Sequence, residues 1–353
     1  MFSNVSLPAK ENENTIEKTI KRNKTSSDND YSLQCSPKKK HTETENKKTE
    51  KSEIEKTEKS ENEKTEKSEI EKTEKSENEK TEKSEIEETE NNGFERLKFD
   101  NHTTFDIKCS ESKPWISSID ELPNGNVVLT DFCNCKLYVY NQSLEIYKAI
   151  DVSGKPCAIA VINSDKIAVT LQEKKSVALV NILTRKTFRY LNVEDSCHGI
   201  TYTDDNLVLN CLEKGLTIIS LDGAVQNTIS DVTGEAYLCS SDNGNIYCAV
   251  YWSHKVLCFN RHGDEVYSFS NLTMKCIRGI SVDHQGQVFT SEFGKNKIHV
   301  INSEGTKSHV ILSKKHGINN PLCVHFNRND MCLYVSNNDG ESVSMYKLDS
   351  SSE

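Results

Sequence analysis

A unit of about 40 residues recurs six times along the chain, and this repeat constrains the fold more than any other feature. Each copy reads as four short runs of alternating apolar and polar residues, divided by Asn, Gly and Ser. The copies begin near Lys113, Lys155, Ser196, Glu235, Cys276 and Asn320. Four-stranded units at this period are typical of radial blades, so we expect an all-β fold, a six-bladed β-propeller.

The turn between the first two strands of each unit supports this interpretation. A glycine, which accepts positive φ, recurs there in three copies, as Asn124-Gly125, Asn243-Gly244 and Gln285-Gly286. In two other copies we expect aspartate to adopt the same left-handed geometry, at Ser164-Asp165 and at Asp204-Asp205.

The sixth copy contains only three strands before the chain ends. They are "PLCVHF", "MCLYVSN" and "SVSMYKL". Residues 103–109 precede the first copy and alternate, with Phe105, Ile107 and Cys109 facing inward. We therefore predict that residues 103–109 supply the outer strand of the last blade, which closes the ring and removes an exposed sheet edge. The predicted propeller domain spans residues 103–348.

Residues 1–92 have a different composition. Between Glu50 and Glu90 almost every residue is Glu, Lys, Ser or Thr, and the large apolar side chains are Ile54, Ile70 and Ile86. Such a segment buries too little apolar surface to offset a backbone entropy cost of about 1–2 kcal/mol per residue. We expect disorder here. The 16-residue isoleucine spacing does not fit a coiled coil, which needs apolar residues every 3.5 positions.

The repeats of this segment allow two interpretations. The first is a solvated spacer. The alternative is regulation by phosphorylation, because five serines are each followed three positions later by Glu; they are Ser52, Ser60, Ser68, Ser76 and Ser84. The run "PKKKH" at residues 37–41 matches a nuclear import signal, a match that short basic runs often make by chance.

Charge and cysteine usage limit the function classes. The net charge of −10 is shared, because residues 1–92 carry 19 of the 44 Lys and Arg and 24 of the 54 Asp and Glu. Neither part is basic, which argues against nonspecific nucleic-acid binding. The start of the chain lacks an apolar signal-peptide core, so we expect the 13 cysteines to be reduced thiols. No run of about 18 apolar residues occurs. We expect a cytoplasmic protein that does not bind membranes, with the nucleus as the alternative.

Two strings, "RGISVDHQGQVFTSEFGKNKIHVINSEG" and "PNGNVVLTDFCNCKLYVYNQS", resemble the NHL repeat. The region resembles the six-bladed NHL propeller that ends many tripartite-motif (TRIM) proteins. The resemblance implies a module that binds substrates or partners, which in TRIM proteins is attached to RING and B-box zinc domains. No zinc-finger spacing precedes the propeller, and Cys35 is the only cysteine of residues 1–92, so we do not expect ligase activity in this chain.

Candidate site residues lie where the chain enters each innermost strand, around the channel mouth. Aligning the units places six residues there, namely Ser117, Cys157, His198, Ala236, Arg278 and Leu322. The predicted binding face consists of Trp115, Ser117, Cys157, His198, Tyr237 and Arg278. We predict no catalytic set, no metal and no cofactor.

Two metalloenzyme functions are alternatives to recognition. Glu111 stands before Pro114 and Trp115 somewhat as a metal-binding Glu does in SMP-30-like lactonases, but no companion Asn or Asp is evident. The lyase variant of the NHL fold uses a histidine-bound zinc with Tyr and Arg, and His198 and Arg278 are the candidates for such a site in this sequence. The other histidines, His254, His262 and His284, are predicted in outer turns and cannot converge. The "CNC" run at residues 133–135 is predicted to be an ordinary loop.

The sequence therefore predicts an intracellular interaction scaffold: a monomeric propeller that binds protein partners, with links to ubiquitin pathways only through those partners. RNA binding at the same face is the alternative, through Arg278, Lys113 and Lys155 with Trp115 and Tyr237.

Overall fold

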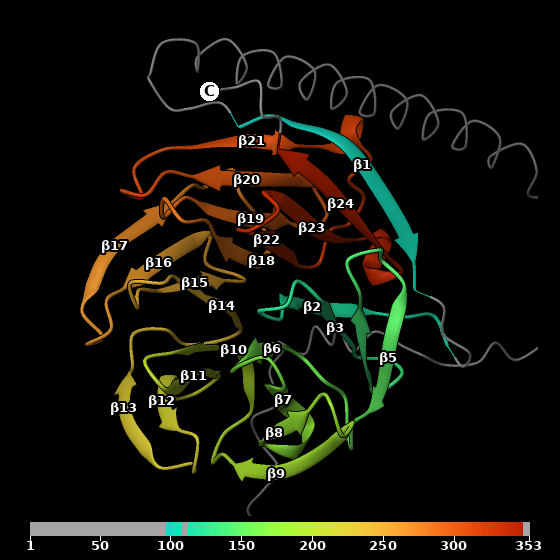
Figure 1. The fold of residues 1–353 in the computed structure, drawn as a ribbon. Helices are drawn as coiled ribbons and strands as arrows, with labels where there is room; N and C mark the ends of the chain where they lie inside the picture. The colour runs from blue at the N-terminus through green and yellow to red at the C-terminus, as the bar shows by residue number, and fades with distance from the viewer. Residues whose placement is uncertain (1–96, 108–111, 349–353) are drawn as a thin grey trace, which may run out of the picture. The chain divides into compact units, whose positions relative to one another are not determined.

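The computed structural model describes residues 97–107 and 112–348. Twenty-four strands in these residues form six four-stranded antiparallel sheets, arranged as blades around a central channel (Figure 1). The predicted all-β, six-bladed propeller is confirmed. The predicted disorder of residues 1–92 and the predicted roles of Cys109 and Glu111 lie outside the described residues.

Each blade follows the chain from its innermost to its outermost strand, except the sixth, whose outermost strand is β1. The strands are β1 (Phe99–Asp106), β2 (Ile116–Glu121), β3 (Val127–Asp131), β4 (Lys136–Tyr140), β5 (Ile146–Asp151), β6 (Ile159–Val161), β7 (Lys166–Leu171), β8 (Ser176–Asn181), β9 (Lys186–Asn192), β10 (Cys197–Thr203), β11 (Asn206–Cys211), β12 (Gly215–Ser220), β13 (Val225–Ile229), β14 (Ala236–Ser240), β15 (Ile246–Val250), β16 (Lys255–Phe259), β17 (Glu265–Ser270), β18 (Ile277–Val282), β19 (Val288–Glu292), β20 (Lys297–Ile301), β21 (Ser308–Leu312), β22 (Val324–Asn327), β23 (Cys332–Asn337) and β24 (Ser342–Leu348).

Three short 3-10 helices, η1 (Gln172–Lys174), η2 (Lys314–His316) and η3 (Asn338–Gly340), complete the described elements. Among these residues no helix is long and apolar enough to cross a membrane. We call the end of the channel where the innermost strands begin the upper face, and the end where they stop the lower face.

The turns between the first two strands have the predicted geometry at four of five positions. Gly125, Gly244 and Gly286 have φ of 79°, 84° and 81°, and Asp204 and Asp205 also have positive φ. The prediction is wrong for the Ser164-Asp165 turn, which lacks positive φ. There Asn163 caps the turn instead, because its side-chain oxygen accepts hydrogen bonds from the backbone N–H groups of Asp165 and Lys166 at 3.1 and 2.9 Å.

The core lies between the blades. The described residues contain six hydrophobic clusters, and each joins the facing sides of two neighbouring blades. Middle strands are buried on both sides, as β3 shows, because each blade packs against two others. Outer strands alternate, as β5 does, because one of their sides meets solvent.

The ring is closed as the sequence predicts, by an N-terminal strand in the last blade. Strand β1 pairs antiparallel with β24, from Phe99 opposite Leu348 to Asp106 opposite Ser342 (Figure 1). Ile107 is 5% exposed in the cluster between blades 6 and 1. The strand begins at Phe99 rather than at residue 103, since a bulge between Asp100 and His102 breaks the alternation that would have revealed it.

Candidate binding face at the upper channel mouth

Glycines let the innermost strands of neighbouring blades approach each other at the upper face. A Cβ on Gly199 would lie 2.3 Å from the backbone oxygen of Ala236, and one on Gly279 would lie 2.5 Å from the backbone nitrogen of Val324. These glycines follow His198 and Arg278 directly. Their close approach therefore gathers both side chains at the mouth.

His198 packs against Tyr237 from the next blade, with ring centroids 4.8 Å apart at 85°. Burial lowers the pKa of His198, as does the charge of Arg278, against the opposing effect of Glu235. The imidazole is thus neutral near pH 7. Its Nδ1 atom is buried and has no hydrogen-bond partner among the described residues. Burial likewise raises the pKa of the Tyr237 hydroxyl.

Arg278 is held between two aromatic rings. Its guanidinium carbon lies 4.9 Å from the centroid of Tyr251 and 4.6 Å from that of Phe293, which are cation–π distances. Nη2 donates to the Tyr251 hydroxyl at 3.2 Å, whereas the buried Nε finds no acceptor in the described part of the chain. Trp252, 61% exposed, stands 4.2 Å from Tyr251 and extends this aromatic surface to solvent.

Tyr251, Trp252 and Phe293 were missed in the sequence because they follow the second strand of a blade rather than precede the first. A signal was present. Phe132, Tyr251 and Phe293 occupy the same turn position in the three copies that repeat most clearly. Aligning the turns as well as the strand starts would have found this aromatic series.

The structure corrects the predicted ring at Ala236, and it also buries the ring residue Leu322. Ala236 is fully buried, and Tyr237 occupies the place equivalent to His198 and Arg278, since both Tyr237 and Arg278 are the second residue of their strands. Ala236 N–H donates to the side-chain oxygen of Asn210 at 2.8 Å, so its backbone ties blade 4 to blade 3.

Ser117 and Cys157 are committed to local contacts. The Ser117 hydroxyl donates to the backbone oxygen of Pro156 at 3.0 Å, a contact that joins blades 1 and 2. It also lies 2.9 Å from the Thr130 hydroxyl of its own blade. Cys157 is 4% exposed and its thiol donates to Gln172 Oε1 at 3.6 Å. Burial raises the pKa of this thiol to about 12, so it stays protonated and is a poor nucleophile.

Trp115 belongs to a second aromatic group on the same face. Its ring lies 5.3 Å from Phe132, and the Lys155 ammonium lies 5.3 Å from the Phe132 centroid. Lys155 also pairs with Glu173 at 2.8 Å. Nearby, Lys113 pairs with Glu341 at 2.7 Å. Both lysines of the predicted RNA-binding set therefore form exposed ion pairs with glutamates, which compete with phosphates for them.

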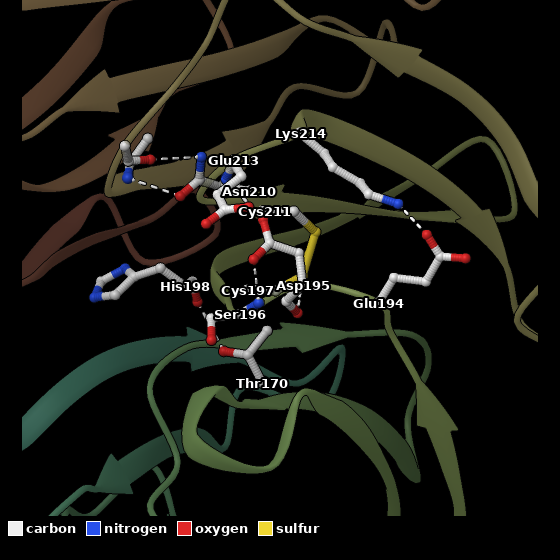
Figure 2. The surroundings of a disulfide bond; sticks show 12 residues. Thr170, Glu194, Asp195, Ser196, Cys197, His198, Asn210, Cys211, Glu213 and Lys214 are labelled. Carbon is white, nitrogen blue, oxygen red and sulfur yellow. Dashed lines mark hydrogen bonds and ion pairs between the residues drawn. A yellow bond between two sulfur atoms is a disulfide. The ribbon is translucent and has the colours of Figure 1, made fainter. Parts of the chain in front are cut away.

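A disulfide joins Cys197 to Cys211, which face each other on β10 and β11 directly beside His198 (Figure 2). The prediction that all thiols are reduced, Cys211 among them, is wrong for this pair. The strand register explains why the sequence did not reveal this disulfide, because the two cysteines become opposite partners only once these strands pair. Asp195 caps the adjoining loops by accepting N–H groups from Ser196 and Glu213, both at 2.7 Å.

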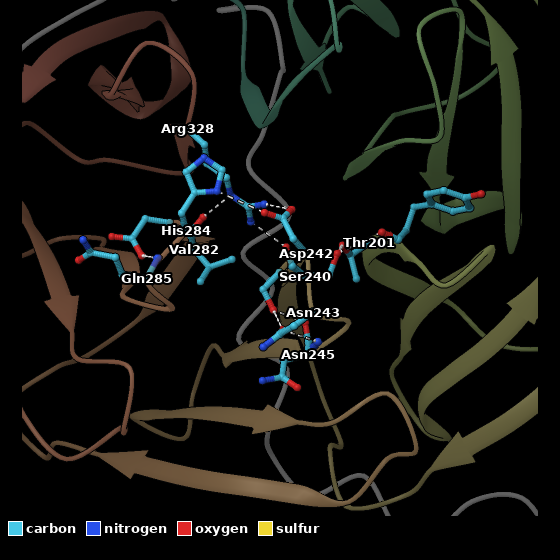
Figure 3. A network of polar contacts seen from close by, with 12 residues as sticks. Thr201, Ser240, Asp242, Asn243, Asn245, Val282, His284, Gln285 and Arg328 are labelled. Carbon is cyan, nitrogen blue, oxygen red and sulfur yellow. Dashed lines mark hydrogen bonds and ion pairs between the residues drawn. The ribbon is translucent and has the colours of Figure 1, made fainter.

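The lower face has a different chemistry. The channel encloses about 520 Å³ and is lined on this side by Asp120, Glu121, Asp242 and Arg328. Arg328 donates to the backbone oxygens of Val282 and Ser240, each at 3.0 Å, and pairs with Asp242, to which His284 also lies close (Figure 3). This network ties blades 4, 5 and 6 together.

His254, His262 and His284 are spread out, as predicted. His254 contacts the backbone oxygen of Met274 at 2.6 Å in an upper turn, whereas His262 and His284 occupy lower turns. Within residues 97–107 and 112–348, no group of three or more His, Cys, Asp or Glu could hold a metal ion. Cys133 and Cys135 flank a turn between β3 and β4 and take no part in the disulfide.

The architecture defines the class, a six-bladed β-propeller, and comparison with solved structures agrees. Virginiamycin B lyase from Staphylococcus aureus has a TM-score of 0.55 at 10% identity and covers 70% of this chain and 100% of its own. A streptogramin B lyase has a TM-score of 0.54 at 13% identity, covering 70% and 98%. The Cps50 (Swd1) propeller domain of Myceliophteria thermophila has a TM-score of 0.55 at 7% identity, and the match covers 72% of this chain and 100% of that domain.

These identities show a shared fold alone. No protein-family model matches the chain, and no curated protein matches it in sequence.

Proposed function

We propose that the chain is a recognition propeller of the NHL, TRIM-like type, which binds a protein partner through its upper face. The observation that carries this proposal is Arg278 between Tyr251 and Phe293 with the exposed Trp252 beside them. Arginine, tyrosine and tryptophan are the residues that dominate protein interfaces energetically. A guanidinium fixed by two rings loses little side-chain entropy on binding.

Charge favours a protein partner over RNA. Several phosphates would each need a cation at the mouth. Lys113 and Lys155 are paired with glutamates, which leaves Arg278 as the cation best placed for a ligand. The proposed partner therefore needs few anionic groups and more apolar surface, as a protein does.

Two further parts of the proposal concern the whole chain. The propeller domain, predicted from the sequence as residues 103–348, is inferred to include all of β1 from Phe99, and the charged segment of residues 1–92 is inferred to be separate from it. Any link to ubiquitin conjugation runs through the bound partner. The protonated Cys157 and the neutral His198 do not form an activated thiolate–imidazolium pair, which supports recognition over thiol catalysis.

Affinity capture from native tissue with the full chain tests the proposal. Arg278→Glu should lose the specific partner, whereas Lys307→Glu should keep it. Lys307 is a matched control because it is exposed, belongs to the same blade and lies in a lower turn. Mixed single-stranded RNAs should show no submicromolar gel shift at near-physiological salt. An RNA shift that Arg278→Glu abolishes would overturn the protein assignment.

A further inference from the structure

A second concave site lies between blades 2 and 3 at the lower face, away from the upper mouth. It encloses about 410 Å³, within the range of sites that hold a ligand or anchoring side chains. We call it the seam groove, and its lining residues are Ile162, Asn163, Lys166, Leu179, Phe188, Arg189, Tyr202 and Leu221. Most of these side chains are apolar, although the groove is open to water.

Phe188 reaches this groove because of a bulge in the outer strand of blade 2. The β8–β9 register shifts between Leu179 and Val180, and Phe188 is the extra residue that the shift leaves on β9. Phe188 lines the groove and is 53% exposed. A mostly apolar groove with an exposed aromatic side chain in its lining is typical of an interaction surface.

Blade 3 extends this surface. Its turn after β12 rests on β9, since Arg189 Nη2 donates to the backbone oxygen of Asp222 at 2.9 Å and Gly223 approaches Leu191. Val225, which begins β13 just beyond that turn, is 64% exposed. The groove and the exposed side chains around it thus form a continuous surface across the seam.

The charges beside the groove are positive in balance. Lys166 and Lys186 form no ion pair with a carboxylate among the described residues, unlike the lysines of the upper mouth, whereas Arg189 is attracted to the carboxylate of Asp222. Asp165 and Asp222 accept hydrogen bonds from neutral groups and keep their charge: Asp165 accepts from Asn181 Nδ2 at 2.9 Å, and Asp222 accepts from the Ser220 hydroxyl and from Ala224 N–H. Three cations beside two carboxylates leave an excess of positive charge, which favours an anionic ligand.

We propose that the seam groove binds an acidic peptide segment of a partner protein, with one aromatic or branched aliphatic side chain seated in the groove. Asp or Glu residues beside that anchor pair with Lys166 and Arg189. The apolar lining combines the aliphatic side chains of Ile162, Leu179 and Leu221 with the rings of Phe188 and Tyr202. Because aliphatic side chains are the majority, the lining favours a peptide anchor over nucleic acid, whose bases stack on aromatic platforms. This site goes beyond the proposed function, because it lies on the opposite face and engages a partner independently of Arg278.

The test is a random heptapeptide display library selected against the full chain, followed by affinity measurement with the enriched synthetic peptides. The selected peptides should combine acidic residues with one large apolar residue. Phe188→Ser and Lys166→Glu should each weaken binding at least tenfold. Val266→Ser is the matched control, because Val266 is 54% exposed on β17, the outer strand of blade 4, and it should change affinity less than twofold.

Three results would overturn the inference: no enriched acidic peptide, peptides that bind Phe188→Ser as tightly as the unaltered chain, or single-stranded RNA that binds and is lost with Lys166→Glu. Unchanged thermal melting of both variants confirms that they fold. Arg278→Glu should bind the same peptides normally, so failure here is distinguishable from failure of the upper-face proposal.

Discussion

Replacing Ile107 with Ala tests the ring closure. The Ile107 side chain is 5% exposed and belongs to the cluster that joins Tyr138 and Tyr140 of blade 1 to Tyr334 and Val343 of blade 6. Truncation of a buried isoleucine costs about 2–5 kcal/mol through lost burial and a residual cavity. In a domain of this size each kcal/mol lowers the melting temperature by roughly 2–4 °C. A value of about 3 kcal/mol thus predicts a fall of roughly 6–12 °C.

Circular dichroism at increasing temperature measures this fall. Thr103→Ala is the control, because Thr103 lies on β1, the strand that Ile107 directly follows, and its side chain is exposed; it should melt within about 1–2 °C of the unaltered protein. The transition should remain single, since the seam holds the whole ring together. An Ile107→Ala protein that melts with the Thr103→Ala control would refute closure by this segment.

Three further predictions concern stability. Reducing the Cys197–Cys211 bond, which closes a loop of 14 residues in sequence separation, should lower the free energy of unfolding by about 3 kcal/mol, and Cys211→Ser should remove the effect of the reductant on melting. The pKa of His198 in the folded protein lies below its unfolded value near 6.5, so the unfolded state binds the proton first as pH falls. The free energy of unfolding should therefore fall below pH 6.5, by up to about 1.4 kcal/mol per pH unit. His198→Gln should flatten this slope in urea titrations. Gly279→Ala should cost about 1–3 kcal/mol because its methyl group would meet the backbone of Cys323 and Val324, and a normal urea midpoint would contradict the close approach.

The repeat period predicted the architecture because each blade is a local unit with its own alternation and turn residues. Closure was also predictable, since a copy with three strands needs a fourth. The start of β1 was not, because a bulge at Asp100 interrupts the pattern. The predicted positive φ at Asp165 was wrong for a similar local reason, because the Asn163 side chain accepts the N–H groups of the turn and makes positive φ unnecessary.

The candidate face was predictable only in part. His198, Tyr237 and Arg278 were found because they stand at strand starts, whereas the rings that hold Arg278 come from turns of two different blades. Such contacts depend on which blades are neighbours and how their turns lean, and a single sequence does not encode that directly. The Cys197–Cys211 pairing was missed for the same reason, since it depends on the register of two strands.

The most direct test of partner recognition at the upper face is the dissociation constant of the captured partner for Arg278→Glu compared with Lys307→Glu. Loss of a central interface arginine typically costs 2 kcal/mol or more, which corresponds to roughly 30-fold weaker binding. We predict at least that loss for Arg278→Glu, and a change below twofold for Lys307→Glu. Equal dissociation constants for the two variants would contradict the account.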